Sequence, residues 1–115
     1  MGITSTLKSG EGIARVATGT YITDTTAAAH DVNCGFTPKY VRIMNETGDA
    51  FMEWNDTMAD AEAMVLVGDT DPVTWQLVTS NGVTPLDDGT THGFRIGLNT
   101  DVNVTNQQVS WLAIG

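Results

Sequence analysis

Hydrophobic and polar residues alternate along several short stretches of the chain, which is the pattern of half-buried β-strands. The clearest stretch is 40–45, where Val41 and Ile43 point to one face and the intervening side chains to the other. Residues 46–49 have the composition of a turn, and residues 50–55 supply a second alternating stretch. The two stretches together predict a β-hairpin.

Similar patterns predict further strands at 15–23, 64–67, 73–78, 83–85, 93–98, 101–104 and 108–114. Val73, Trp75 and Leu77 share one face of their strand, and Asn81-Gly82 predicts a tight turn after it. In the later strands, one-sided burial is expected for Phe94, Ile96 and Leu98, and Val109, Trp111 and Ala113 alternate against Leu112 and Ile114.

Two segments are less clear. Residues 25–34 fit an extended segment, although three consecutive alanines favour a helix. Residues 56–63 fit a loop or a single helical turn. The sequence therefore predicts an all-β fold: a single β-sandwich or barrel-like domain of short antiparallel strands over residues 15–115. Residues 1–14 have few apolar anchors and are expected to form an extended, flexible N-terminal arm.

Composition agrees with this fold class, because 18 Thr, 12 Gly and 7 Asn occur in only 115 residues. The chain has 14 acidic and 5 basic residues and a formal net charge of −9. That charge repels phosphate backbones and anionic lipids, so neither a nucleic-acid nor a membrane partner is expected. No apolar run is long enough to cross a bilayer, and no signal peptide is recognisable at the start.

Charge is distributed unevenly along the chain. Residues 1–45 contain four basic and three acidic side chains, whereas residues 46–115 contain one basic and eleven acidic side chains. This asymmetry suggests that one end of the chain meets the other across a contact between subunits.

Catalytic chemistry is poorly represented. His92 precedes a strand close to Asp87 and Asp88 and could be oriented by a carboxylate, but a surface histidine explains it more simply. Cys34 is the single cysteine and has no basic neighbour that would activate it. The sequence therefore predicts that the protein is not an enzyme.

Binding chemistry leaves two alternatives open. The acidic loops at 56–62 and 69–71 could hold calcium weakly, although solvated loops explain them more simply, so no metal or cofactor is predicted. Trp54, Trp75 and Trp111 each lie on a predicted strand. We expect all three in the core, the alternative being an exposed platform that binds sugars.

Four stretches, at 35–47, 53–59, 93–97 and 109–115, resemble small virion proteins of tailed bacteriophages, in particular those that decorate or cement the head. The resemblance covers residues 35–115 and is shared in part with pieces of phage tail fibres. It implies a structural protein that is made in the host cytoplasm and binds the outer surface of the capsid, stabilising the shell. The implied partners are the major capsid protein and further copies of this chain, as a homotrimer.

Charge and position suggest which residues make such capsid or inter-subunit contacts. The apolar and basic residues of the arm and the following basic residues are the candidates: Ile3, Leu7, Lys8, Ile13, Arg15, Lys39 and Arg42. The alternative is a tail or fibre module that binds a glycan of the host surface through exposed tryptophans and the acidic loops.

Overall fold

The computed structural model describes residues 15–23, 25–26, 28–68 and 71–115. Its described residues form no helix, which confirms the all-β class. The predicted arm, 1–14, lies outside the described residues. The strands are β1 (Val16–Ile22), β2 (His30–Asn33), β3 (Tyr40–Asn45), β4 (Ala50–Asn55), β5 (Glu62–Val67), β6 (Thr74–Asp87), β7 (His92–Ile96) and β8 (Gln108–Ile114).

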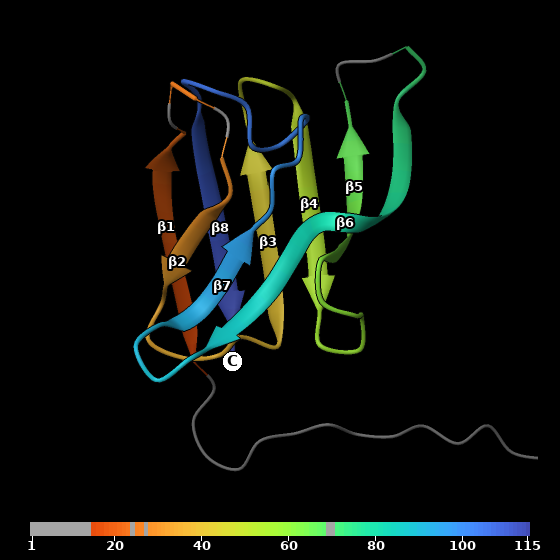
Figure 1. The fold of residues 1–115 in the computed structure, drawn as a ribbon. Helices are drawn as coiled ribbons and strands as arrows, with labels where there is room; N and C mark the ends of the chain where they lie inside the picture. Colours follow the sequence, from red (N-terminus) through yellow and green to blue (C-terminus); the bar gives the residue numbers. More distant parts are fainter. Residues whose placement is uncertain (1–14, 24, 27, 69–70) are drawn as a thin grey trace, which may run out of the picture.

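All eight strands belong to one antiparallel sheet in the order β1-β8-β3-β4-β5-β6-β7-β2. The sheet curls on itself, so that β7, β2 and the second half of β6 lie over the inner face of β1, β8, β3 and β4 (Figure 1). The result is a half-barrel with two unequal layers: a large layer that runs from β1 to the first half of β6, and a small layer of three strands.

Strand β6 passes from one layer to the other. Its residues 74–78 pair with β5, whereas residues 83–87 pair with β7, and the register with β5 shifts between Glu62 and Ala63. Asn81-Gly82 lies within this strand at the bend, so the predicted tight turn is wrong. Asn81 has a positive φ, and a Cβ on Gly82 would lie 2.4 Å from the carbonyl oxygen of Glu62. Glycine is therefore required where the two strands approach most closely.

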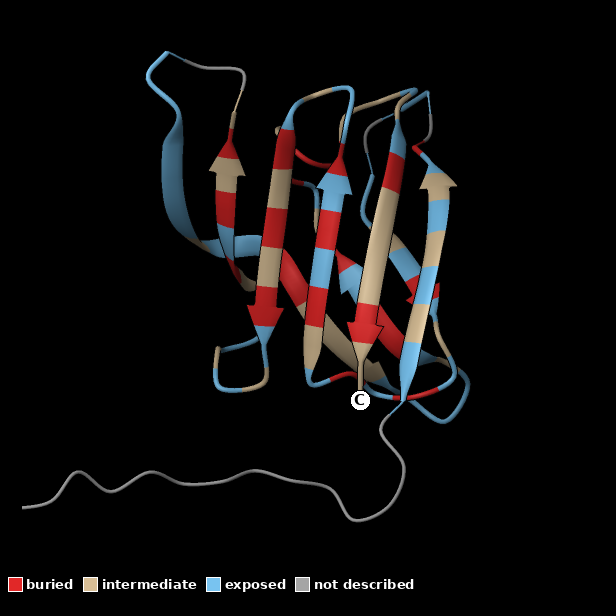
Figure 2. Ribbon diagram, turned by 180° about the vertical axis from the view of Figure 1, so that it is seen from behind, coloured by how far each residue is buried: buried red, intermediate tan, exposed pale blue. Residues whose placement is uncertain are grey.

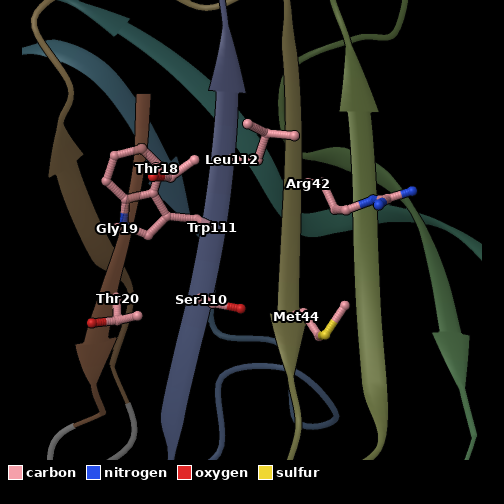
Figure 3. Close-up of a pocket in the computed structure, with 8 residues that line it drawn as sticks. All are labelled: Thr18, Gly19, Thr20, Arg42, Met44, Ser110, Trp111 and Leu112. Atoms are coloured by element: carbon pink, nitrogen blue, oxygen red, sulfur yellow. The ribbon is translucent and has the colours of Figure 1, made fainter. Parts of the chain in front are cut away.

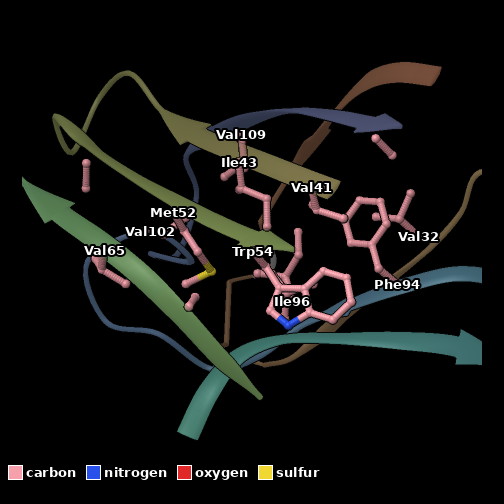
Figure 4. Close-up of a cluster of buried hydrophobic side chains, with 14 of the residues drawn as sticks. Val32, Val41, Ile43, Met52, Trp54, Val65, Phe94, Ile96, Val102 and Val109 are labelled. Atoms are coloured by element: carbon pink, nitrogen blue, oxygen red, sulfur yellow. The ribbon is translucent and has the colours of Figure 1, made fainter. Parts of the chain in front are cut away.

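The core fills the space between the two layers (Figure 4). From the large layer it receives the inward side chains of β3, β4 and β5, including Val41, Ile43 and Trp54. The small layer contributes Phe94 and Ile96, which are fully buried. The predicted alternation in β3 and the β3–β4 hairpin are therefore confirmed.

Residues 97–107 connect β7 to β8 and cover one end of the half-barrel. The predicted strand at 101–104 is wrong, because this segment is a loop whose turns are closed by side chains. Leu98 lies outside β7 and is 40% exposed, so the expected burial of Leu98 is also wrong. Alternating Val102 and Val104 resemble a strand, but only Val102 is fully buried.

Four polar side chains hold this loop in place, and they are the buried polar residues of the described chain: Thr23, Asn45, Asn99 and Asn103. The Asn45 amide donates to the Val102 carbonyl at 2.9 Å and to the Gln107 side chain at 2.7 Å, and its oxygen accepts from the Gly48 amide. The buried amide nitrogen and oxygen of Asn45 thus both have hydrogen-bond partners within the protein in place of water, as buried polar groups require.

The two edge strands, β1 and β2, meet through side chains. The Tyr21 and His30 rings stack with centroids 3.9 Å apart. The Tyr21 hydroxyl donates to the Asn103 side chain at 3.2 Å, and the Asn103 amide donates to the Ala28 carbonyl at 2.7 Å. Side-chain contacts therefore bring the edges together at this point.

Replacement of Asn45 with alanine is expected to lower the free energy of unfolding by about 1–3 kcal/mol, because it leaves buried partners without hydrogen bonds. Chemical denaturation measures the change. Thr100→Ala, an exposed change in the same loop, is the control and should have almost no effect. Equal effects of the two substitutions would contradict the role given to Asn45.

Burial raises the pKa of Tyr21. Above pH ~10 the unfolded chain loses the phenol proton while the folded chain keeps it. The contribution of Tyr21 to stability should therefore be fully present below that pH and be lost as pH rises toward the higher pKa of the folded state. Unfolding measured between pH 9 and about 11 should show a shallower decline for Tyr21→Phe than for the natural chain. Equal declines in the two proteins would contradict an origin in Tyr21. Tyr40 is present in both proteins and therefore cannot cause a difference between them.

Candidate binding surface

The outward side chains of the large layer form a surface that we call the outer face. Strand register arranges most of them in two rows across six strands. One row is Thr18, Leu112, Arg42, Glu53, Met64 and Leu77, and the other is Thr20, Ser110, Met44, Phe51, Leu66 and Trp75. No described element covers these rows, and Figure 2 views the strands of the large layer from this side.

The outer face is apolar and electrically neutral, although the chain carries a net charge of −9. In the two rows only Arg42 and Glu53 are charged, and they pair with each other at 3.3 Å. The Arg42 guanidinium also lies 5.9 Å from the centre of the Phe51 ring. An exposed apolar sheet face of this extent is typical of an interaction surface.

A shallow hollow of about 400 Å³ lies toward the β1 end of this face (Figure 3). It exists partly because small side chains line the floor where β1 and β8 pair. Gly19 has no side chain, and a Cβ there would lie 2.5 Å from the Trp111 ring. Trp111 packs edge-on against Phe94 in the core, so the hollow is built on a fixed support.

The structure places the seven predicted contact residues in two groups. Four of them lie outside the described residues: Ile3, Leu7, Lys8 and Ile13. The other three lie on the large layer: Arg15, Lys39 and Arg42. Gly115 donates to the Arg15 carbonyl and Lys39 donates to the Ile114 carbonyl, so Arg15 and Lys39 flank the end of β8. We call Arg15 and Lys39 the basic corner, and neither has an ion-pair partner among the described residues.

The expectation that all three tryptophans are buried is wrong for Trp75. Trp54 is 2% exposed and donates to the Ala59 carbonyl, and Trp111 is half-buried, whereas Trp75 is 58% exposed. Trp75 lies on the outer face, on the opposite side of the sheet from the small layer, and no described element covers it there. The alternating pattern correctly placed Val73, Trp75 and Leu77 on one face, but alternation cannot reveal whether another layer covers it.

Candidate catalytic and metal-binding groups are dispersed or exposed. The His92 imidazole lies 3.0 Å from the Asp87 carboxylate, and both side chains are largely exposed at a turn. The Cys34 thiol donates to the Phe36 carbonyl at 3.1 Å. In the described part of the chain, no three His, Cys, Asp or Glu residues gather in a group that could hold a metal ion. Part of the predicted acidic loop, Asp69, lies outside that part.

The small layer neutralises its own basic residue. Arg95 on β7 lies 2.7 Å from Asp31 on β2, and this hydrogen-bonded pair lowers the pKa of the Asp31 carboxyl. Arg15, Lys39 and Arg42 are thus the remaining described basic side chains, and all three belong to the large layer. Apart from Arg42 on the outer face, these basic residues flank the end of β8.

Comparisons with known protein families, curated proteins and solved structures found no match. Within the described residues, no helix is present that could span a membrane. The geometry of the outer face and the basic corner is therefore the basis for assigning a function.

Trp75 should account for most of the tryptophan fluorescence that acrylamide can quench, because its ring is exposed and that of Trp54 is not. Trp75→Phe should remove most of the quenchable signal, whereas Trp54→Phe should leave it in place. Quenching of the natural chain and both variants measures this. Equal loss from the two variants would contradict the difference in exposure between Trp75 and Trp54.

Proposed function

We propose that this chain is a structural virion protein of a tailed bacteriophage, which binds the outside of the capsid and stabilises the shell, acting by binding and not by catalysis. The observation that carries the proposal is the neutral, apolar outer face on a strongly acidic chain. The resemblance of residues 35–115 to phage decoration proteins supplies the identity of the partner.

The charge distribution supports binding to a protein surface. A partner that approaches the outer face meets apolar side chains and one internally neutralised ion pair, so little charge must be desolvated. Arg15 and Lys39 at the corner are free to meet acidic groups of the partner and to set its orientation. The remaining surface is acidic, which suits a protein exposed on the outside of a shell and disfavours contact with the packaged DNA.

Binding of this kind stabilises a shell by mass action. A protein that binds the assembled lattice, and not separate capsid subunits, adds its binding free energy to the cost of opening the shell. No conformational change in the bound protein is required for this effect. The sheet described above, whose outer face is formed by strand pairing within one chain, is suited to it.

Co-sedimentation with purified, expanded phage heads that lack their decoration protein tests the proposal. We expect saturable binding, and we expect Met44→Glu, at the centre of the outer face, to weaken it about tenfold or more. Thr90→Glu places the same charge on an exposed turn of the small layer and should bind normally. Absence of saturable binding, or equal binding by both variants, would overturn the proposal.

Exposed Trp75 favours a second candidate, a tail or fibre module that binds a host glycan. Aromatic rings exposed on a sheet face are suitable platforms for sugar rings, and Phe51 fixes Trp75 by an edge-to-face contact with centroids 5.3 Å apart. Retention on immobilised polysaccharide from the host, lost in Trp75→Ala, together with no binding to heads, would establish this function in place of the first.

A further inference from the structure

The first half of β6 is an unusual element, because it is exposed on both faces and along one edge. Residues 74–78 pair with β5, and within the described chain no strand pairs with their other edge, since β7 pairs only from Val83 onward. Val73, Trp75 and Leu77 are each more than half exposed. An apolar strand with a free edge is a site for pairing with another strand.

Hydrogen-bond geometry shows which backbone groups face this free edge. The Gly68 amide donates to the Asp49 carbonyl, so Gly68 and alternate residues of β5 bond to β4. The intervening residues of β5 then bond to Thr74, Gln76 and Val78 of β6. It follows that the amide and carbonyl groups of Trp75 and Leu77 point outward.

Strand β1 meets β2 through the Tyr21 ring, which packs against the core, but it has a matching unpaired backbone edge at the opposite end of the large layer. Gly115 donates to the Arg15 carbonyl, and Thr23 donates to the Gln107 carbonyl, so the odd-numbered residues of β1 bond to β8. The backbone groups of Thr18 and Thr20 therefore point away from β8. No strand of the described chain pairs with this edge of β1.

We propose that copies of this chain associate head to tail, by pairing the free edge of β6 in one copy with the free edge of β1 in the next. This inference goes beyond the proposed function, because it requires no capsid. Neighbouring strands of the large layer run in opposite directions, so β1 and β6, at its two ends, are antiparallel to each other. The new pair between two copies is therefore also antiparallel, and the outer face continues across the junction.

The register that continues the two outer rows also satisfies the backbone. It sets Leu77 opposite Thr18 and Trp75 opposite Thr20 of the next copy, and these four residues are those whose amide and carbonyl groups point outward. Side-chain faces and backbone hydrogen bonds are therefore compatible in the same arrangement. Residues 74–78 pair with 17–21 in this register.

The charge and the shape of the β6 and β1 edges favour a second copy of this chain as the partner. Residues 72–86 and 16–23 contain no charged side chain, so two acidic chains meet without direct repulsion. A groove of about 450 Å³ lies along the β6 edge, and residues 98–101 form its other wall. In this register Arg15 of the next copy lies opposite Ser80, which lines the groove and carries no charge. A two-fold β6–β6 contact would instead bring two Asp101 loops together.

Two proline substitutions test the contact, because each removes an outward amide that no strand pairing among the described residues uses. Thr20→Pro blocks the β1 edge, and Leu77→Pro blocks the β6 edge. Light scattering should give a mass above that of one chain for the natural protein and the mass of one chain for each variant. A natural protein with the mass of one chain at every concentration would overturn the proposal.

Mixing the two proline variants separates head-to-tail pairing from every two-fold contact. Each variant retains one intact and complementary edge, so an equimolar mixture should form a heterodimer and nothing larger. Association of Thr20→Pro by itself would show a β6–β6 contact, and association of Leu77→Pro by itself would show a β1–β1 contact. Either of these results would overturn the proposal.

A disulfide trap covers the case in which a proline variant does not fold, which circular dichroism and thermal unfolding would reveal. Thr18→Cys and Leu77→Cys are combined in a Cys34→Ser background. Within one chain these positions are separated by five strand spacings, roughly 24 Å, too far for a disulfide. We expect covalent multimers on oxidation from the pair and no ladder of multimers from either single cysteine. Absence of multimers from the folded pair would overturn the proposal.

The outcomes also remain separate from those of the proposed function. Head binding that fails while the natural protein associates through these edges would reject the virion role and leave the pairing intact. A natural protein that has the mass of one chain but binds heads saturably would reject the pairing and leave the virion role intact.

Discussion

The architecture depends on a buried network of hydrogen bonds that fastens the β7–β8 loop across the end of the half-barrel. Asn45 reaches the loop from the large layer, Asn103 reaches back to Tyr21 and Ala28 at the sheet edges, and Thr23 binds Val104 and Gln107 as β1 ends. An apolar core alone would hold the two layers together but would not fix where the curled edges meet, because hydrophobic contact has no direction. Directional hydrogen bonds that cannot be replaced by water determine that position, and a buried group left without a partner is costly.

Once the sheet has closed in this way, its two layers are unequal. Six strands contribute to the large layer and three to the small one, with β6 contributing to both through its bend. The inner face of the large layer is covered by the small layer except at the first half of β6. Its outer face is covered by nothing in the described chain (Figure 2). The exposed apolar face and the two free edges are thus consequences of one topology.

The distribution of charge determines which surfaces of this protein are suited to association. Copies of a chain with a net charge of −9 repel one another, so association is favoured through regions that lack this charge. The outer face, the edge of β1 and the edge of β6 are such regions, and Arg15 and Lys39 flank the end of β8 next to β1. The face and the edges point in different directions. One copy can therefore contact a surface below it and its neighbours beside it at the same time.

The sequence by itself determined the all-β class, the β3–β4 hairpin and the shared faces of Val41 and Ile43 and of Val73, Trp75 and Leu77, because these depend on local alternation and turn chemistry. It also suggested Arg15, Lys39 and Arg42 as contact residues through charge alone, and those contacts stay a prediction. It misassigned Trp75, the bend at Asn81-Gly82 and the loop at 101–104. Alternation states that residues share a face but not whether another layer covers it, and Asn-Gly fits a bulge as well as a turn. Only the tertiary structure decided these points, because coverage, bending and loop closure depend on contacts between residues such as Tyr21 and Asn103 that lie far apart in the chain.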